Sequence, residues 1–214
     1  KNFKLISPPI HKVISKILPD IWGESLIHPQ YVEMIEYIKN TNNYYKVYSA
    51  SNGNIDPYKL DIKRLVNSGL TEIMVAIDNN NQEDYVKYRK KGSFDKVLTF
   101  IKELHRHKVN EKSKMKINGL IIVSSVNEKN IDDIKKTFRD YVDYFTIKKM
   151  RVFHDYEEKN DFVEEFFDYR PKNKLHQYKP NRRKQGCLGV AAGIYVDAQS
   201  NIIACCGDPK RRYK

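Results

Sequence analysis

Short apolar runs rich in β-branched residues alternate with longer amphipathic segments between residues 29 and 150. Runs of this kind, bounded by polar clusters, are typical of buried strands. The pattern predicts four strands, at residues 46–50, 72–78, 116–124 and 143–150.

The amphipathic segments beside these strands are predicted to be helices. One has Asp56 in the N-cap position, Pro57 at the first helical position and Gly69 at a position that suits the end of a helix. Three others repeat apolar residues every three or four positions, and they begin at Pro29, Ser93 and Asn130. Strict alternation of helix and strand requires crossover connections, so it predicts an α/β fold with a parallel sheet covered by helices.

Polar residues follow three of the predicted strands. The clusters lie at residues 51–54, 78–81 and 124–127. Because the loops at the carboxyl ends of parallel strands converge on one face, we expect these clusters to lie together where such folds bind ligands.

The chain of 214 residues is basic, with a formal net charge of +12 and a pI near 9.4. A basic surface attracts polyphosphate, which raises nucleic acid as an alternative partner. The lysines and arginines are spread along the whole chain, however, and this favours a solvated surface over a nucleic-acid site. No apolar run approaches the roughly 20 residues needed to cross a bilayer, and residues 1–15 lack a signal-peptide pattern. We therefore expect a cytoplasmic protein without a membrane partner.

The C-terminal part has a different pattern. Periodicity fades over residues 153–186, which indicates a connecting segment, and strand-like runs at residues 194–197 and 202–205 then predict a β-hairpin. The three cysteines of the chain are Cys187, Cys205 and Cys206. They do not form a disulfide framework, and they are better explained as thiols or metal ligands.

Several short motifs occur in a fixed order along the chain. They are Trp-Gly-Glu-Ser-Leu-Ile-His-Pro at residues 22–29, Ser-Asn-Gly at 51–53, Val-Ala-Ile-Asp-Asn at 75–79 and Tyr-Arg-Lys-Lys-Gly-Ser-Phe at 88–94. In this order they resemble the Gly-Gly-Glu-Pro-Leu-Leu-His-Pro, Thr-Asn-Gly, Val-Ser-Ile-Asp-Gly and Tyr-Arg-x-Gly-x-Phe motifs of radical S-adenosylmethionine (SAM) enzymes. Residues 187–208 resemble the start of the SPASM or twitch domain of these enzymes, which binds an auxiliary iron–sulfur cluster. The resemblance covers most of the chain.

This resemblance implies a domain organisation. Residues 1–152 would form a partial (β/α) TIM-like barrel, residues 153–186 a connecting segment, and residues 187–214 a truncated SPASM or twitch domain.

The resemblance also implies a cofactor site. Its residues would be Gly23, Glu24, Ser51, Asn52, Asp78 and Arg89. Backbone groups at Gly23 and the Glu24 carboxylate suit the ammonium of SAM, and Arg89 suits its carboxylate. Asn52 and Asp78 are candidates for the ribose or for the substrate pocket. Each has a structural alternative, because Glu24 and Asp78 can serve as caps and Arg89 can belong to a solvated helix face.

The cysteines are assigned to the auxiliary cluster by the same resemblance. Cys187 and Cys205 have a spacing similar to that of the SPASM or twitch ligands, with Ser200 in place of a glycine, and Cys206 is the weaker candidate. Buried free thiols are the alternative, since three thiolates do not complete a four-thiolate cluster site.

The largest departure from the family concerns its SAM-cleaving [4Fe–4S] cluster. That cluster is held by Cys-x3-Cys-x2-Cys after the first strand, but no cysteine precedes Cys187. The chain is therefore either a degenerate relative or a sequence from which segments are absent. If residues 2–7 are the first strand and residues 11–18 its helix, no strand fits between that helix and Gly23, and this favours absent segments.

The function implied by the resemblance is reductive cleavage of SAM and abstraction of hydrogen from a peptide or small-molecule substrate. It would require a [4Fe–4S] cluster, an auxiliary iron–sulfur cluster and an electron donor such as flavodoxin or ferredoxin. Two alternatives stay open: a barrel-fold binding protein that lacks the SAM cluster, and a basic RNA-associated protein.

Overall fold

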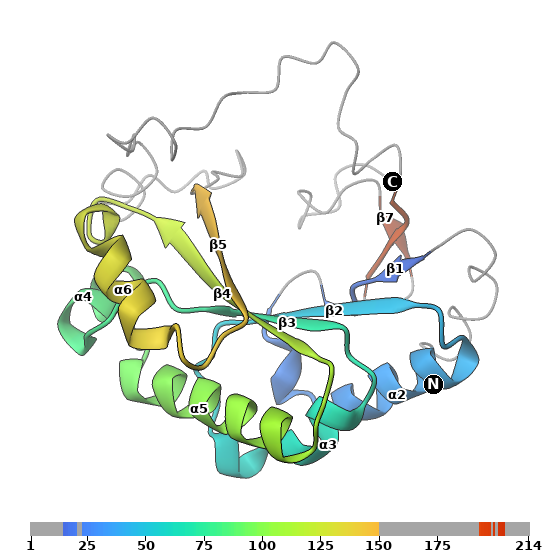
Figure 1. The fold of residues 1–214 in the computed structure, drawn as a ribbon. Helices are drawn as coiled ribbons and strands as arrows, with labels where there is room; N and C mark the ends of the chain where they lie inside the picture. The colour runs from blue at the N-terminus through green and yellow to red at the C-terminus, as the bar shows by residue number, and fades with distance from the viewer. Residues whose placement is uncertain (1–14, 21–22, 150–192, 198, 200, 204–214) are drawn as a thin grey trace.

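The computed structural model describes residues 15–20, 23–149, 193–197, 199 and 201–203 (Figure 1). Five parallel strands form one sheet in the order β1-β2-β3-β4-β5. The strands are β1 (Lys16–Ile17), β2 (Lys46–Ser51), β3 (Glu72–Ala76), β4 (Lys116–Val123) and β5 (Tyr144–Lys149). The α-helices are α2 (Tyr31–Thr41), α3 (Ile62–Asn67), α4 (Gln82–Tyr88), α5 (Phe94–Asn110) and α6 (Ile131–Phe138). Short 3-10 helices are η2 (Ser25–Ile27), η3 (Pro57–Lys59) and η4 (Glu128–Asn130).

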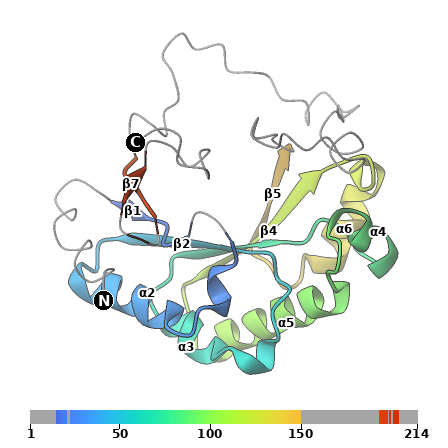
Figure 2. The ribbon, with the colours of Figure 1, turned by 180° about the vertical axis from the view of Figure 1, so that it is seen from behind.

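Helices α2, α3 and α5 lie along one face of the sheet, as the two opposite views in Figures 1 and 2 show. The core lies between these helices and the sheet. Alternate residues of β2 and β3 are buried there, including Val47, Ile73 and Val75. From α5, Phe100 and Leu104 reach the same core and are fully buried. The alternation of side chains along each strand thus positions one set of residues for packing, as predicted from the pattern.

The predicted α/β fold with a parallel sheet is confirmed. Every strand pair from β1 to β5 is parallel, and strands that follow one another in sequence are neighbours in the sheet. Within the described residues β1 and β5 are edge strands, so this part of the chain is an open sheet and not a closed barrel.

Several predicted helix boundaries are also confirmed. The Ser93 hydroxyl accepts a hydrogen bond from Lys96 N at 3.3 Å and caps α5. Asn130 is the N-cap residue of α6, although its side chain makes no capping bond. Gly69 has a φ of +87° immediately after the C-cap of α3, a conformation that glycine adopts at little cost.

The prediction of one continuous helix from Asp56 to Gly69 is wrong. Asp56 caps only η3, by accepting from Tyr58 N at 3.1 Å. Leu60 is extended, and Asp61 begins α3 by accepting from Arg64 N at 2.8 Å. A second N-cap residue close after the first therefore divides the segment into two short helices.

The prediction of a helix over residues 11–18 is wrong where the structure describes it. Lys16 and Ile17 form strand β1, which pairs with Lys46 and Val47 of β2. The main-chain hydrogen bonds offered by the edge of β2 outweigh the weak helical pattern of so short a segment. A strand therefore precedes Gly23, which removes the argument that a strand is absent from this part of the chain.

The predicted C-terminal hairpin is confirmed in its described part. Strands β6 (Tyr195–Val196) and β7 (Ile202–Ile203) pair in antiparallel fashion. In the turn, the Asp197 carboxylate accepts from Gln199 N at 2.8 Å and from Asn201 N at 2.9 Å. The predicted domain boundaries at residues 152 and 186 lie outside the described residues.

Candidate functional site at the carboxyl edge of the sheet

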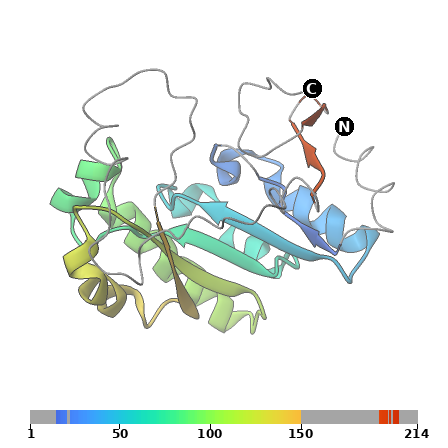
Figure 3. The ribbon, with the colours of Figure 1, turned by 90° about the horizontal axis from the view of Figure 1, so that it is seen from above.

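The carboxyl ends of β2, β3 and β4 lie next to one another along one edge of the sheet, which is seen from above in Figure 3. The polar clusters that follow these strands meet there, as the sequence predicted. Ser51, Asp78, Asn79, Ser124 and Asn127 are all buried. Buried polar side chains need internal partners, so their contacts determine the geometry of this edge.

Glu24 joins the segment after β1 to the end of β2. Its Oε2 accepts from Asn52 N at 2.6 Å, and its Oε1 accepts from Leu26 N at 3.4 Å. The second contact caps η2, so the structural alternative for Glu24 is present. A carboxylate offers about four acceptor positions, so Glu24 retains capacity for a ligand ammonium. The adjacent Gly23 is exposed and has a φ of +86°.

Asp20 holds the same segment against β2, and its role was not anticipated from the sequence. Its Oδ2 accepts from Ala50 N at 2.9 Å, from the Ser49 hydroxyl at 2.8 Å and from the Tyr31 hydroxyl at 3.0 Å. Burial and the Asp20 charge raise the pKa of Tyr31 above its ordinary value. These contacts of the half-buried Asp20 fix the chain four residues before Glu24.

The turn after β2 is built from side-chain to main-chain hydrogen bonds. Ser51 Oγ accepts from Gly53 N at 3.0 Å, and Asn52 Oδ1 accepts from Asn54 N at 2.7 Å. Gly53 has a φ of +71°, and a Cβ at this position would lie 2.9 Å from a methyl group of Val75. Glycine is therefore required here by both backbone conformation and space.

Asp78, just beyond β3, forms a buried ion pair with Arg89. The Arg89 Nε and Nη2 atoms lie 2.9 Å and 2.8 Å from Asp78 Oδ2. Asp78 Oδ1 accepts from Ile122 N of β4 at 2.7 Å. The Asp78 side chain is fully buried, whereas 27% of the Arg89 side chain is exposed. The pair thus presents its cation, and not its carboxylate, at the surface of the edge.

The electrostatics of this pair reflect its burial. Burial raises the pKa of Asp78 above its ordinary value, while the Arg89 guanidinium and the Ile122 N–H act in the opposite direction. Burial opposes the charged form of Arg89, but the Asp78 carboxylate outweighs this effect and raises the pKa of the guanidinium. Arg89 is therefore a permanent cation held at the edge.

Arg89 is positioned by α4, a helix that the sequence analysis missed. Asn81 caps it by accepting from Asp84 N at 2.9 Å, and Arg89 is its C-cap residue. The ion pair with Asp78 and the 27% exposure of its side chain argue against the alternative that Arg89 belongs to a solvated helix face, while its role in a cofactor site stays a prediction.

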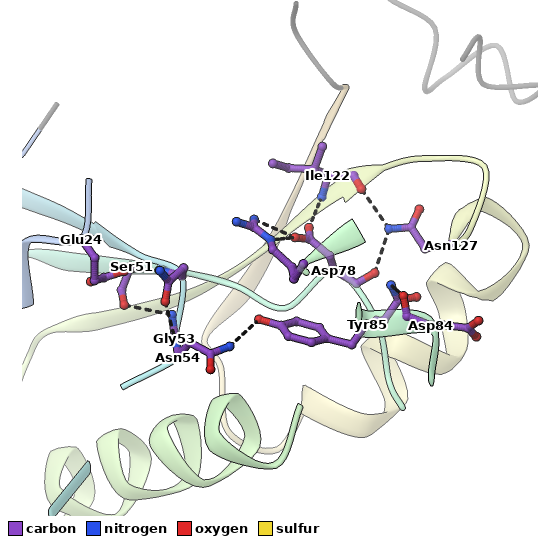
Figure 4. A network of polar contacts seen from close by, with 12 residues as sticks. Glu24, Ser51, Gly53, Asn54, Asp78, Asp84, Tyr85, Ile122 and Asn127 are labelled. Atoms are coloured by element: carbon purple, nitrogen blue, oxygen red, sulfur yellow. Dashed lines mark hydrogen bonds and ion pairs between the residues drawn. The ribbon is translucent and has the colours of Figure 1, made fainter. Parts of the chain in front are cut away.

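The two halves of the edge are connected by Asn54 and Tyr85. Asn54 Nδ2 donates to the Tyr85 hydroxyl at 3.1 Å, and Tyr85 lies on α4, which leads to Arg89. In Figure 4, dashed lines join Asn54 to Tyr85 in one group and Asp78 to Ile122 and Asn127 in another. The structure thus brings the predicted residues Glu24, Ser51, Asn52, Asp78 and Arg89 to one edge; whether they bind a cofactor stays a prediction.

The described residues do not fit an iron–sulfur cluster. They include no cysteine, and they contain no group of three or more His, Cys, Asp or Glu side chains that could hold a metal ion. The predicted cluster ligands Cys187, Cys205 and Cys206 lie outside the described residues.

Comparisons with family models and curated proteins do not assign this chain to a family. No protein-family model matches the sequence, and no curated protein matches it. Among the helices of the described residues, none is long and apolar enough to traverse a bilayer.

Two solved structures are similar to this chain at low level. Coproporphyrinogen III oxidase (HemN) from Escherichia coli, described as a radical SAM enzyme, is 11% identical with a TM-score of 0.42, over 78% of this chain and 37% of that chain. A protein of Burkholderia cenocepacia J2315 described as a phosphonomutase is 13% identical with a TM-score of 0.40, over 59% of this chain and 54% of that chain. The chain thus spans about half or less of the lengths of these two proteins. At TM-scores this low, neither similarity assigns a function to the chain.

Proposed function

We propose that the carboxyl edge of the sheet binds SAM and that the protein is a radical SAM enzyme. The observation that supports this proposal is the position of the motif residues. Glu24, Asn52, Asp78 and Arg89 come from four separate segments that resemble radical SAM motifs, and the fold gathers them at the carboxyl edge, where open α/β sheets generally bind ligands.

Each end of the amino-acid part of SAM has a complementary group in this arrangement. Glu24 is a half-buried carboxylate suited to the ammonium, and Arg89 is a partly exposed guanidinium suited to the carboxylate. Asp78 is buried behind Arg89, so its proposed role is to hold the guanidinium and not to contact the ribose.

The reaction of the family, reductive cleavage of SAM and hydrogen abstraction from a peptide or small-molecule substrate, is chemistry that an iron–sulfur cluster supplies. The contribution assigned to this chain is to bind and orient SAM. The auxiliary cluster, the electron donor and the substrate remain part of the proposal without support from the described residues.

A second candidate is a SAM-binding protein without a cluster. It is favoured by one observation, namely that no Cys-x3-Cys-x2-Cys motif occurs in the given sequence, in which no cysteine precedes Cys187. The two candidates differ in iron content after anaerobic reconstitution of the full-length gene product. The enzyme is expected to bind iron and sulfide and to release 5′-deoxyadenosine from SAM under reducing conditions, whereas the binding protein retains SAM intact.

The SAM site is tested by titration calorimetry with Glu24→Gln and a matched control. We expect Glu24→Gln to weaken SAM binding by about tenfold, because a neutral amide keeps the contact with Asn52 N but cannot pair with an ammonium. Binding of 5′-methylthioadenosine, which lacks the amino-acid part, should be unchanged. Glu83→Gln is the control, since 87% of that side chain is exposed. Failure of the unaltered protein to bind SAM would refute the proposal, and retention on heparin that withstands competitor would then favour the RNA-associated alternative.

A further inference from the structure

Asn127 is a fully buried amide in the loop after β4, and the proposed site does not use it directly. Its side chain makes three hydrogen bonds to the main chain. Nδ2 donates to the carbonyl oxygen of Asp78 at 2.7 Å and to that of Ile122 at 2.9 Å, and Oδ1 accepts from Ser124 N at 2.8 Å. The amide therefore ties the end of β3 to the end of β4, as Figure 4 shows for Asn127, Asp78 and Ile122.

This connection determines where the Asp78 carboxylate lies. Asp78 Oδ1 accepts from Ile122 N at 2.7 Å, so Asp78 and Ile122 are joined twice, once by the carboxylate and once through Asn127. The other oxygen of the carboxylate holds Arg89. A shift of Asp78 relative to β4 would therefore move the guanidinium as well.

Arg89 depends on this support because Asp78 is its one ionic partner among the described residues. Nε and Nη2 both face Asp78 Oδ2, and Nη1 makes no hydrogen bond or ion pair with any described residue. Its guanidinium carbon also lies 5.0 Å from the centre of the Tyr88 ring, which supports the group from one face. Because 27% of the Arg89 side chain is exposed, its donor Nη1 can then serve an anionic group of a ligand.

We infer that Asn127 is a positioning residue that sets the affinity of the site for the carboxylate of its ligand, by fixing Asp78 and through it Arg89. The inference rests on the proposed function. It is distinct from a purely structural role, since a structural role would not distinguish ligands that differ only in that carboxylate.

The test compares two ligands on one protein. SAM and its decarboxylated form share the adenosine, the sulfonium and the amine, and differ only in the carboxylate. We measure the affinity of the full-length protein for each ligand by titration calorimetry, in the unaltered protein and in Asn127→Ala. The ratio of the two affinities is the readout, and it is insensitive to the total amount of folded protein.

We expect the unaltered protein to prefer SAM and Asn127→Ala to lose most of that preference. Its affinity for SAM should fall on the order of tenfold, while its affinity for decarboxylated SAM changes by less than about twofold. Asn130→Ala is the matched control, because Asn130 lies three residues further along the chain, at the end of η4, and its side chain makes no capping bond. It should leave both affinities unchanged.

Asn127→Ser provides a second variant in case Asn127→Ala does not fold. A serine hydroxyl can still accept from Ser124 N, but it does not reproduce both amide donations, so the same selective loss is expected. Equal weakening of both ligands, or no change in either, would overturn the inference while leaving SAM binding intact. If the unaltered protein binds neither ligand, the proposed function itself fails and the inference with it.

Discussion

Both ends of strand β4 are held by an aspartate, but the two aspartates are placed differently. At the carboxyl end, Asp78 accepts from Ile122 N at 2.7 Å and pairs with Arg89. At the amino end, Asp143 accepts from Ile117 N at 2.7 Å and pairs with Lys108 and Lys116 at 2.6 Å and 3.1 Å. The Asp78 side chain is fully buried, whereas 17% of the Asp143 side chain is exposed.

The electrostatic consequences are opposite. Burial raises the pKa of Asp78 despite its cation. Burial also acts to raise the pKa of Asp143, but the Ile117 N–H and the two lysines outweigh it and lower that pKa below its ordinary value. The amino end is therefore arranged for stability, while the carboxyl end carries a desolvated charge that a hydrophobic pair could replace. A loss of folding stability of this kind is expected where a charged side chain serves to bind a ligand.

The largest effect is expected when Asp78 is removed alone. Asp78→Ala leaves Arg89 without its carboxylate and Ile122 N without its acceptor, and it should lower the free energy of unfolding by about 3–5 kcal/mol. Urea denaturation of the variant measures this loss. The double variant Asp78→Asn/Arg89→Met keeps an acceptor for Ile122 N and removes both charges, so it should recover most of the stability. A double variant as unstable as Asp78→Ala would contradict the view that the ion pair costs stability.

A smaller loss is expected at the amino end. Asp143→Ala removes the acceptor for Ile117 N and the partner of two lysines, at a site more open to water. The free energy of unfolding should fall by about 1.5–3 kcal/mol, the range for a hydrogen bond to a charged group. The same denaturation experiment measures it, and a loss greater than that of Asp78→Ala would reverse the comparison.

Lowering the pH should change the stability contributions of the two aspartates in different ways. A carboxylate whose pKa is lowered in the folded state contributes stability above its unfolded pKa of about 3.9, and this is lost as the pH falls through the lower folded value. Asp143 is such a group. Asp143→Asn should therefore lose less stability than the unaltered protein when urea midpoints are compared at pH 5 and pH 3. Asp78→Asn should show no such protection, because the pKa of Asp78 is raised.

The smallest effect is expected for Lys116, whose side chain is 56% exposed. Lys116→Met should change the free energy of unfolding by less than about 1 kcal/mol, since exposed ion pairs contribute little. The change should shrink further in 1 M NaCl because salt screens the pair. A large, salt-independent loss would show that Lys116 has a packing role at the amino end.

The strands and most helix caps could be predicted from the sequence because they depend on local patterns. Ser93 and Gly69 have the residue types that a helix start and a helix end require, and the structure places them so. Helix α4 was missed because only Tyr85 of its residues is buried, so no apolar period was present; the available signal was Asn81 followed by acidic residues in the first turn.

The candidate site was predictable only in part. Motifs identified Glu24 and Arg89, and the parallel topology brought their segments together. Asp20 accepts from Ala50 N and Asn127 donates to the carbonyl oxygen of Asp78, and such contacts between distant segments depend on strand register and not on sequence spacing. Strand β1 was missed for the same reason, because its two residues are a strand only through their pairing with Lys46 and Val47 of β2.

The proposed binding of SAM by the charged pair at the carboxyl edge can be measured by titrating SAM into the double variant Asp78→Asn/Arg89→Met and into the unaltered full-length protein. We predict saturable binding to the unaltered protein and a loss of at least about tenfold in the folded double variant. Equal affinity in the two proteins, or no binding of SAM to the unaltered protein, would contradict the account.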